Sequence, residues 1–184
     1  PLIDAVPVEE PEDKGLGRIR LAQASAASDA AGVVPPEDEN FNKSVNRTLQ
    51  FEGGLNRKDS NGTPSLYGIN QKAHPEVDFS TLTPEKAKQI YRKDYWDSIG
   101  AGKMDPKLAH VAFDTAVIAG PAKARELIAA SGGDPAKLLD LREQFQNGLI
   151  SRNPDKFGKY ATAWNDRLAG LRSDIGATKT EEAA

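Results

Sequence analysis

The sequence predicts an α+β domain that is mostly helical, with one small β-hairpin directly after the first helix. Three observations carry this prediction. Prolines follow helix-capping side chains at several points, apolar residues recur at helical spacing behind them, and one Asn-Gly pair separates two short strand-like segments. Large side chains are absent from the amino-terminal part of the 184 residues, so the domain begins well inside the chain.

The first 40 residues are typical of a flexible acidic leader or linker. They contain no aromatic residue, five prolines, seven alanines, nine acidic residues and three basic residues, for a net charge of −6. Such a segment buries too little apolar surface to offset the entropy lost on ordering. We therefore expect a folded domain over residues 41–175, with a net charge of +3 over residues 41–184, and a flexible tail over residues 176–184.

The helices are predicted from their starts and their apolar stripes. Asn40 is expected to cap the first helix, and later starts are expected at Thr83-Pro84, Asp105-Pro106, Gly120-Pro121, Asp134-Pro135 and Asn153-Pro154. Gly132-Gly133 should end the helix that precedes Asp134. The expected stripes comprise Phe41, Val45, Thr48 and Glu52; Ala87, Ile90, Tyr91 and Tyr95; Leu108, Val111, Ala112 and Val117; Leu138, Leu141, Phe145 and Leu149; and Tyr160, Trp164, Leu168 and Leu171.

The hairpin is predicted between the first two helices. Residues 55–58 and 66–69 form its strands, and they flank the sequence Asp59-Ser60-Asn61-Gly62. Asn-Gly is a strong hairpin signal because both central residues of the favoured two-residue turn need a positive φ.

Composition excludes several classes of function. The chain has no cysteine and two histidines, so we expect no disulfide, no metal site and no thiolate nucleophile. We assign no role to His74 or His110, which we expect at the surface or at helix caps. No apolar run is long enough to span a membrane, and no phosphate-binding glycine motif or base-stacking motif is present, so no cofactor and no nucleic-acid partner is expected.

Glu52 is the strongest candidate for chemistry. It continues the apolar stripe of the first helix, and Gly53-Gly54 ends that helix immediately afterwards. Partial burial and the negative end of the helix dipole both favour the protonated carboxyl, so we expect a raised pKa. A carboxylic acid that is neutral near pH 7 can protonate a poor leaving group.

The hairpin supplies polar partners for such an acid. Asp59 lies near the turn and Ser65 begins the returning strand. A protonated acid beside an ionised carboxylate is the arrangement that cleaves glycosidic bonds, and the Ser65 hydroxyl could hold the attacking water. The alternative is structural, since a glutamate at a helix end and an aspartate in a turn are common.

Three further residues are candidates for substrate binding. Tyr67 and Asn70 follow Ser65 and could line a sugar cleft or simply pack the hairpin. Asp114 lies within the apolar run 111–117, where a carboxylate must be paired or hydrogen-bonded. Bonding to a helix end and contact with a sugar both remain open for it. Trp96 and Trp164 fall on helical stripes and are expected in the core.

Several blocks of the sequence resemble the glycosyl hydrolase 108 family of bacterial and phage N-acetylmuramidases. The resemblance extends over most of residues 41–175. The blocks are Glu52-Gly53-Gly54, Ser65 to Asn70, Tyr95-Trp96, Ala112 to Val117 with Gly120-Pro121, Arg142 to Ile150, and Ala163 to Leu168, the last being similar to the family's C-terminal peptidoglycan-binding segment. The chain departs from the family in the turn, where Asn56 to Asp59 and Asn61-Gly62 replace the usual Asn-Asp-Pro and second Gly-Gly, and where Ser65 replaces a threonine.

The resemblance implies a lysozyme-like fold and a muramidase that hydrolyses the β-1,4 bond between N-acetylmuramic acid and N-acetylglucosamine. Glu52 is then the general acid, and Asp59 with Ser65 follows the order of the more distant T4-type lysozymes. A lytic transglycosylase and an inactive peptidoglycan-binding module remain as alternatives. The expected partner is the glycan strand of peptidoglycan. Because the chain begins at Pro1 with an acidic leader, a further hypothesis is a domain of a larger virion protein, located in the virion or in the bacterial periplasm or cell wall.

Overall fold

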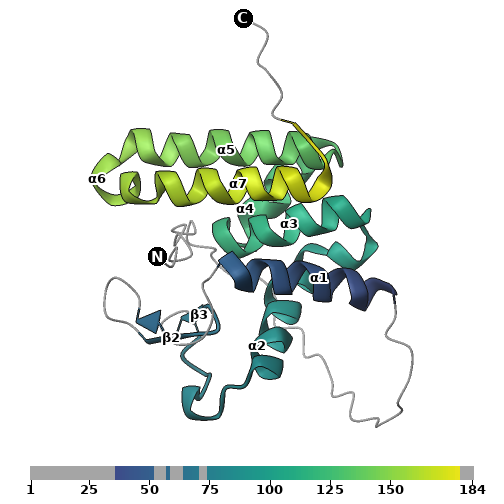
Figure 1. The fold of residues 1–184 in the computed structure, drawn as a ribbon, viewed down its shortest axis with the longest axis vertical. Coiled ribbons are helices and arrows are strands. Elements are labelled where there is room, and N and C mark those ends of the chain that lie inside the picture. Colours follow the sequence, from purple (N-terminus) through teal and green to yellow (C-terminus); the bar gives the residue numbers. More distant parts are fainter. Residues whose placement is uncertain (1–35, 52–56, 59–63, 71–73, 179–184) are drawn as a thin grey trace, which may run out of the picture.

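The computed structural model describes residues 36–51, 57–58, 64–70 and 74–178. The described part is built from helices joined by short turns (Figure 1). The helices are α1 (Pro36–Phe51), α2 (Pro84–Tyr91), α3 (Pro106–Ala119), α4 (Pro121–Ser131), α5 (Pro135–Arg152), α6 (Pro154–Phe157) and α7 (Ala161–Ile175). A π-helical turn, Arg92–Trp96, extends α2, and 3₁₀ turns occupy Phe79–Thr81, Asp97–Ile99, Ala101–Lys103 and Gly158–Tyr160. Within these ranges no helix has the length and apolar character needed to cross a bilayer.

The predicted helix starts are confirmed from α2 onward. The side chains of Thr83, Asp105, Asp134 and Asn153 each accept a hydrogen bond from a backbone N–H of the first helical turn, and a proline occupies the first position. Gly132 ends α4 with a φ of 65°. The predicted cap of the first helix is wrong, because α1 begins at Pro36 and Asn40 lies inside it.

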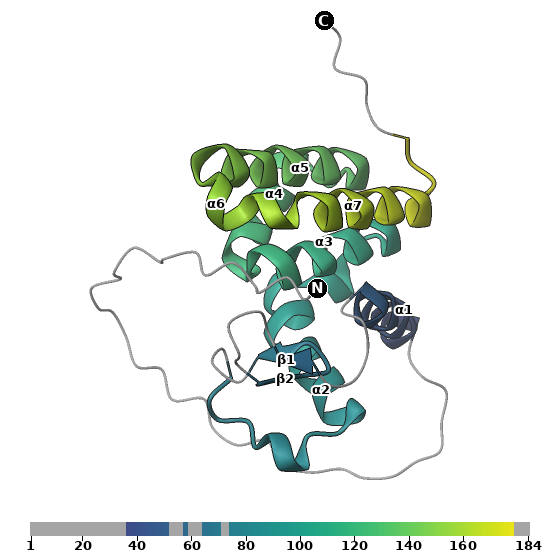
Figure 2. The same cartoon turned by 60° about the vertical axis from the view of Figure 1, so that its left-hand side comes forward.

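The helices form layers. Figures 1 and 2 show α5 and α7 side by side at one end of the molecule, α3 and α4 below them, and α1 packed against α3. The core contains an aromatic cluster in which Phe41, Trp96 and Phe113 contact one another edge to face, with ring centroids 5.5–6.0 Å apart. Trp96 and Trp164 are each 1% exposed, so their predicted place in the core is confirmed. Trp164 stacks with Phe157 and Tyr160 in a separate cluster at the α6 end.

The predicted β-hairpin is wrong, and with it the α+β class, because the described part is almost entirely helical. Strands β1 (Arg57–Lys58), β2 (Pro64–Leu66) and β3 (Ile69–Asn70) hold two, three and two residues and pair antiparallel in the order β1-β2-β3. The expected returning strand, residues 66–69, is interrupted by a two-residue turn. Tyr67 and Gly68 occupy this turn with φ angles of 54° and 74°. The Asn61-Gly62 pair lies outside the described residues.

The predicted stripe of α5 is displaced around the helix. Leu138 is fully buried as expected, but Leu141, Phe145 and Leu149 are half-buried. The other buried positions of α5 are Leu139, Arg142 and Gln146. Two polar side chains therefore occupy core positions of this helix, and an apolar pattern alone selects the wrong face.

The predicted position of His74, at the surface or at a helix cap, is also wrong, and His110 is half-buried. His74 is 8% exposed, and its Nδ1 lies 3.4 Å from Glu76 Oε1. The side chain of His110, a residue of α3, points toward α1, and its Nδ1 lies 3.0 Å from Ser44 Oγ.

Candidate active site

One face of α1 is a buried stripe of side chains that precedes Glu52 in the sequence. Phe41, Val45 and Thr48 are 5%, 0% and 0% exposed, as the helical spacing predicts. α1 ends at Phe51, and Glu52 follows it outside the described residues. The structure therefore supports the stripe up to Thr48 and does not test the expected raised pKa of Glu52.

Asp114 is the centre of a buried charge cluster that joins four helices. Its carboxylate accepts hydrogen bonds from Arg142 Nη1 on α5 at 2.6 Å and from Arg167 on α7, whose Nη2 lies 2.8 Å away. Thr48 Oγ1, on α1, donates to Asp114 Oδ2 over 3.2 Å. Asp114 itself comes from α3, so the last described turns of α1 are bonded through it to α5 and α7.

The cluster holds Asp114 ionised. Burial alone would raise the pKa of Asp114, but the charges and hydrogen bonds of Arg167 and Arg142 outweigh burial and hold that pKa well below its ordinary value. Burial also lowers the pKa of Arg142, and the charge of Asp114 opposes this shift. Asp114, Arg142 and Arg167 are at most 2% exposed, so among the described residues two guanidiniums and one carboxylate of the cluster lie out of contact with water.

These contacts favour the structural interpretation of Asp114 over contact with a sugar. The paired partners are two arginines and not, as the sequence suggested, a helix end. Neither Arg142 nor Arg167 is among the predicted site residues. The signal that could have found them is a charged residue at a core position of a helix, next to an aspartate inside an apolar run, because a buried charge needs a partner.

The short sheet brings two of the predicted site residues together. Ser65 on β2 pairs with Asn70 on β3 and with Arg57 on β1. The backbone register thus places Ser65 opposite Asn70 and does not test a role for either residue. Asp59 lies outside the described residues.

Tyr67 connects the sheet to the core. It is half-buried against the main apolar cluster, and its carbonyl accepts a hydrogen bond from the Tyr91 hydroxyl over 3.2 Å. The Tyr91 ring in turn contacts Phe113, the residue before Asp114, with centroids 6.1 Å apart. These contacts favour packing for Tyr67, and they fix the β2–β3 turn against α2 and α3. Its φ of 54° is unusual for a tyrosine, which indicates that this packing holds a strained turn in place.

Within the described ranges, no group of three or more histidine, aspartate or glutamate side chains could hold a metal ion.

Comparison with known proteins finds a family match over part of the chain. Residues 45–120 match the model of the family described as Glycosyl hydrolase 108. The solved structure of Brucella abortus SagA is similar, with a TM-score of 0.61 and 22% sequence identity, over 80% of this chain and 99% of that chain. No curated protein sequence matches this chain. The structural likeness shows a shared fold, and the family match supports a glycoside hydrolase. Residues 45–120 are therefore similar in sequence to the glycosyl hydrolase 108 family, and the fold is similar to that of SagA.

Proposed function

We propose that this protein is a muramidase that hydrolyses the β-1,4 bond between N-acetylmuramic acid and N-acetylglucosamine in peptidoglycan, with Glu52 as the general acid. The observation that carries the proposal is the buried stripe of α1, whose Val45 and Thr48 lie in the family match and which is bonded at Thr48 to the Asp114 cluster. Glu52 follows Thr48 by four residues in the sequence, which is the spacing that predicts a place on the same stripe.

The other carboxylates of the matched region support the choice of Glu52 by elimination. Glu76, Asp78 and Glu85 are exposed, and hydrogen bonds lower the pKa of each: from the residue's own backbone N–H for Glu76 and Glu85, and from the Ser80 hydroxyl for Asp78. A general acid needs the opposite shift. Asp105 caps α3, and Asp114 is held ionised by two arginines.

Asp94 and Asp97 complete that set and are also paired. Asp94 lies 3.7 Å from His74 Nδ1, and Asp97 lies 3.6 Å from Arg92 Nε, both at the half-exposed or exposed surface of the π-helical and 3₁₀ turns. Each carboxylate between residues 74 and 120 is therefore exposed, paired with a cation or bonded at a helix cap. In the matched region, Glu52 and Asp59 remain as candidates for the general acid.

The proposed reaction proceeds with one proton donated and one water consumed. Glu52 protonates the glycosidic oxygen as its bond to the muramic acid C1 breaks. Asp59 stabilises the developing oxocarbenium ion or orients water, and Ser65 and Asn70, paired across β2 and β3, hold that water or the sugar. The +3 charge of residues 41–184 suits approach to an anionic wall, and the proposed location is the cell wall or a virion that acts on it.

The test is the substitution Glu52→Gln, which preserves shape and removes the acidic proton. We expect it to abolish the clearing of a peptidoglycan suspension while leaving the thermal melt nearly unchanged. Glu39→Gln is the matched control, since Glu39 lies on an exposed turn of α1 in an ion pair with Lys43 whose side chains are 66% and 71% exposed. Full clearing by Glu52→Gln would refute the assignment of Glu52.

Two alternatives predict different outcomes of the same assay. An inactive binding module would give no clearing by the unmodified chain, together with retention on insoluble peptidoglycan. A lytic transglycosylase would clear the suspension and release 1,6-anhydromuropeptides, because the sugar's own hydroxyl replaces water.

A further inference from the structure

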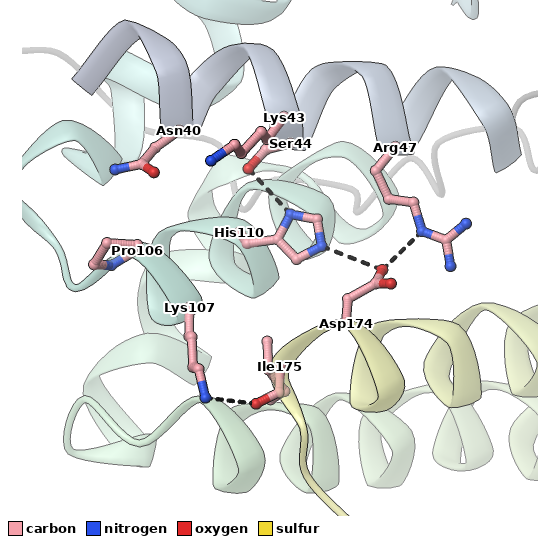
Figure 3. Close-up of a pocket in the computed structure, with 9 residues that line it drawn as sticks. All are labelled: Asn40, Lys43, Ser44, Arg47, Pro106, Lys107, His110, Asp174 and Ile175. Atoms are coloured by element: carbon pink, nitrogen blue, oxygen red, sulfur yellow. Dashed lines mark hydrogen bonds and ion pairs between the residues drawn. The ribbon is translucent and has the colours of Figure 1, made fainter. Parts of the chain in front are cut away.

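A polar pocket lies on the face of α1 that faces α3 and α7. Figure 3 shows it between the middle of α1, the start of α3 and the end of α7. Its volume is about 360 Å³, in the range of small-molecule sites. Its principal lining side chains are Asn40, Lys43, Ser44 and Arg47 from α1, Lys107 and His110 from α3, and Asp174 from α7.

The floor of the pocket is a chain of polar contacts made of two hydrogen bonds and one ion-pair contact. His110 Nδ1 lies 3.0 Å from Ser44 Oγ, and its Nε2 lies 3.5 Å from Asp174 Oδ2 (Figure 3). Arg47 Nε donates to the same Asp174 oxygen over 2.7 Å. This network connects α1, α3 and α7 and gives the pocket a fixed base.

The serine, histidine and aspartate of the floor have the composition of a nucleophilic triad, but not its geometry. Ser44 is 2% exposed, which keeps its hydroxyl from an incoming acyl group. It also lies inside α1, where its backbone N–H belongs to the helix and cannot serve an oxyanion. The floor therefore suits binding rather than acyl transfer.

The rim of the pocket carries cations with spare donors. Lys107 Nζ donates to the Ile175 carbonyl over 2.8 Å, and an ammonium group has two further N–H donors. Lys43 pairs with Glu39 at 3.1 Å, but both side chains are largely exposed, and such pairs are weak and easily exchanged. With Arg47 and Asp174, the lining carries three permanent cations against one carboxylate.

We propose that this pocket binds a carboxylate of the peptide stems of peptidoglycan, through the ammonium groups of Lys43 and Lys107 above the Ser44–His110–Asp174 floor. The inference rests on the proposed function, because peptidoglycan supplies a chain with repeated carboxylates. A peptide carboxylate would accept two charge-assisted hydrogen bonds from the lysines, and the Asn40 amide on the same wall could bond an amide of the stem. Held there, a stem would orient its glycan strand along α1.

The test is binding of N-acetyl-L-alanyl-D-glutamate, which carries two carboxylates and no cation, to the ¹⁵N-labelled full chain followed by NMR. We expect saturable shifts at the backbone amides of Lys107 and His110, and no saturable shift with the diamide of the same peptide. The double variant Lys43→Gln with Lys107→Gln should weaken binding about tenfold. The matched control removes two exposed lysines elsewhere, Lys137→Gln with Lys159→Gln, and should bind as the unmodified chain does.

Several results would overturn the proposal. They are the absence of saturable shifts, equal binding of the diamide, equal weakening by the control pair, or binding of inorganic phosphate as tight as that of the dipeptide. The dipeptide contains no glycosidic bond, so its binding is independent of Glu52. Clearing of peptidoglycan without dipeptide binding would refute only the proposed binding of peptide stems in the pocket. Dipeptide binding without clearing would refute only the proposed muramidase activity.

Discussion

Replacing Asp114 with asparagine removes the carboxylate that two buried arginines share. The substitution keeps the side chain's size but leaves the guanidiniums of Arg142 and Arg167, 0% and 2% exposed, with an amide in place of a charge. Breaking a buried ion pair by removing one partner costs about 3–5 kcal/mol. For a domain of this size, about 4 °C of melting temperature corresponds to 1 kcal/mol, so the midpoint should fall by about 12–20 °C.

Chemical and thermal unfolding followed by circular dichroism measure this loss. Adding Arg142→Met to Asp114→Asn should recover part of it, because one buried cation is removed and an apolar side chain fills its place. A loss below about 1 kcal/mol for Asp114→Asn would refute the buried ion-pair role of Asp114, since ion pairs at the surface contribute that little to the free energy of unfolding.

The pH dependence gives an independent check on the same residue. The pKa of Asp114 is lowered in the folded state from an ordinary 3.8. The contribution of Asp114 to the free energy of unfolding is therefore complete above that pH, and it is lost as the pH falls toward the pKa of the folded state. The difference in stability between the unmodified chain and Asp114→Asn should therefore be constant near neutrality and shrink below about pH 3.8. A difference that grows in acid would contradict the lowered pKa.

Two smaller predictions concern the turns. Tyr91→Phe removes the hydrogen bond to the Tyr67 carbonyl and should cost about 0.5–1.5 kcal/mol in urea unfolding; an unchanged midpoint would show that this bond does not hold the β2–β3 turn. Gly132→Ala places a Cβ at a φ of 65° and should cost about 1 kcal/mol, whereas Gly158→Ala, at a φ of −57° with open space around it, should be neutral or slightly stabilising; equal effects would refute the argument from φ.

The helix starts were predictable because each depends on neighbouring residues alone. A capping side chain before a proline specifies the first turn whatever the helix later packs against, and Asp105, Asp134 and Asn153 all cap as expected. The first helix shows where this prediction fails. Asn40 is an equally suitable capping residue by type, but α1 begins at Pro36, so Asn40 lies inside the helix.

The buried charge cluster could not be predicted, because its members are distant in sequence. Asp114 and Arg142 are 28 residues apart, and Asp114 and Arg167 are 53 apart. Helical periodicity ranks Leu141 and Phe145 above Arg142 and Gln146 for burial, and this ranking is reversed once Asp114 needs a cation across the α3–α5 interface.

The sheet was mispredicted for a related reason. An Asn-Gly pair is the stronger turn signal in isolation but lies outside the described residues, and the two-residue turn within them is Tyr67-Gly68. A tyrosine adopts the positive φ because its ring packs on the core and its carbonyl is bonded by Tyr91, and neither contact is visible in the local sequence.

Digestion of peptidoglycan in ¹⁸O-labelled water, followed by mass spectrometry of the released muropeptides, tests the proposed hydrolysis most directly. A muramidase that uses Glu52 as its acid predicts products ending in a reducing N-acetylmuramic acid that has gained one labelled oxygen, and none of these from Glu52→Gln. Unlabelled anhydro products, or labelled products in equal amount from the Glu52→Gln variant, would contradict it.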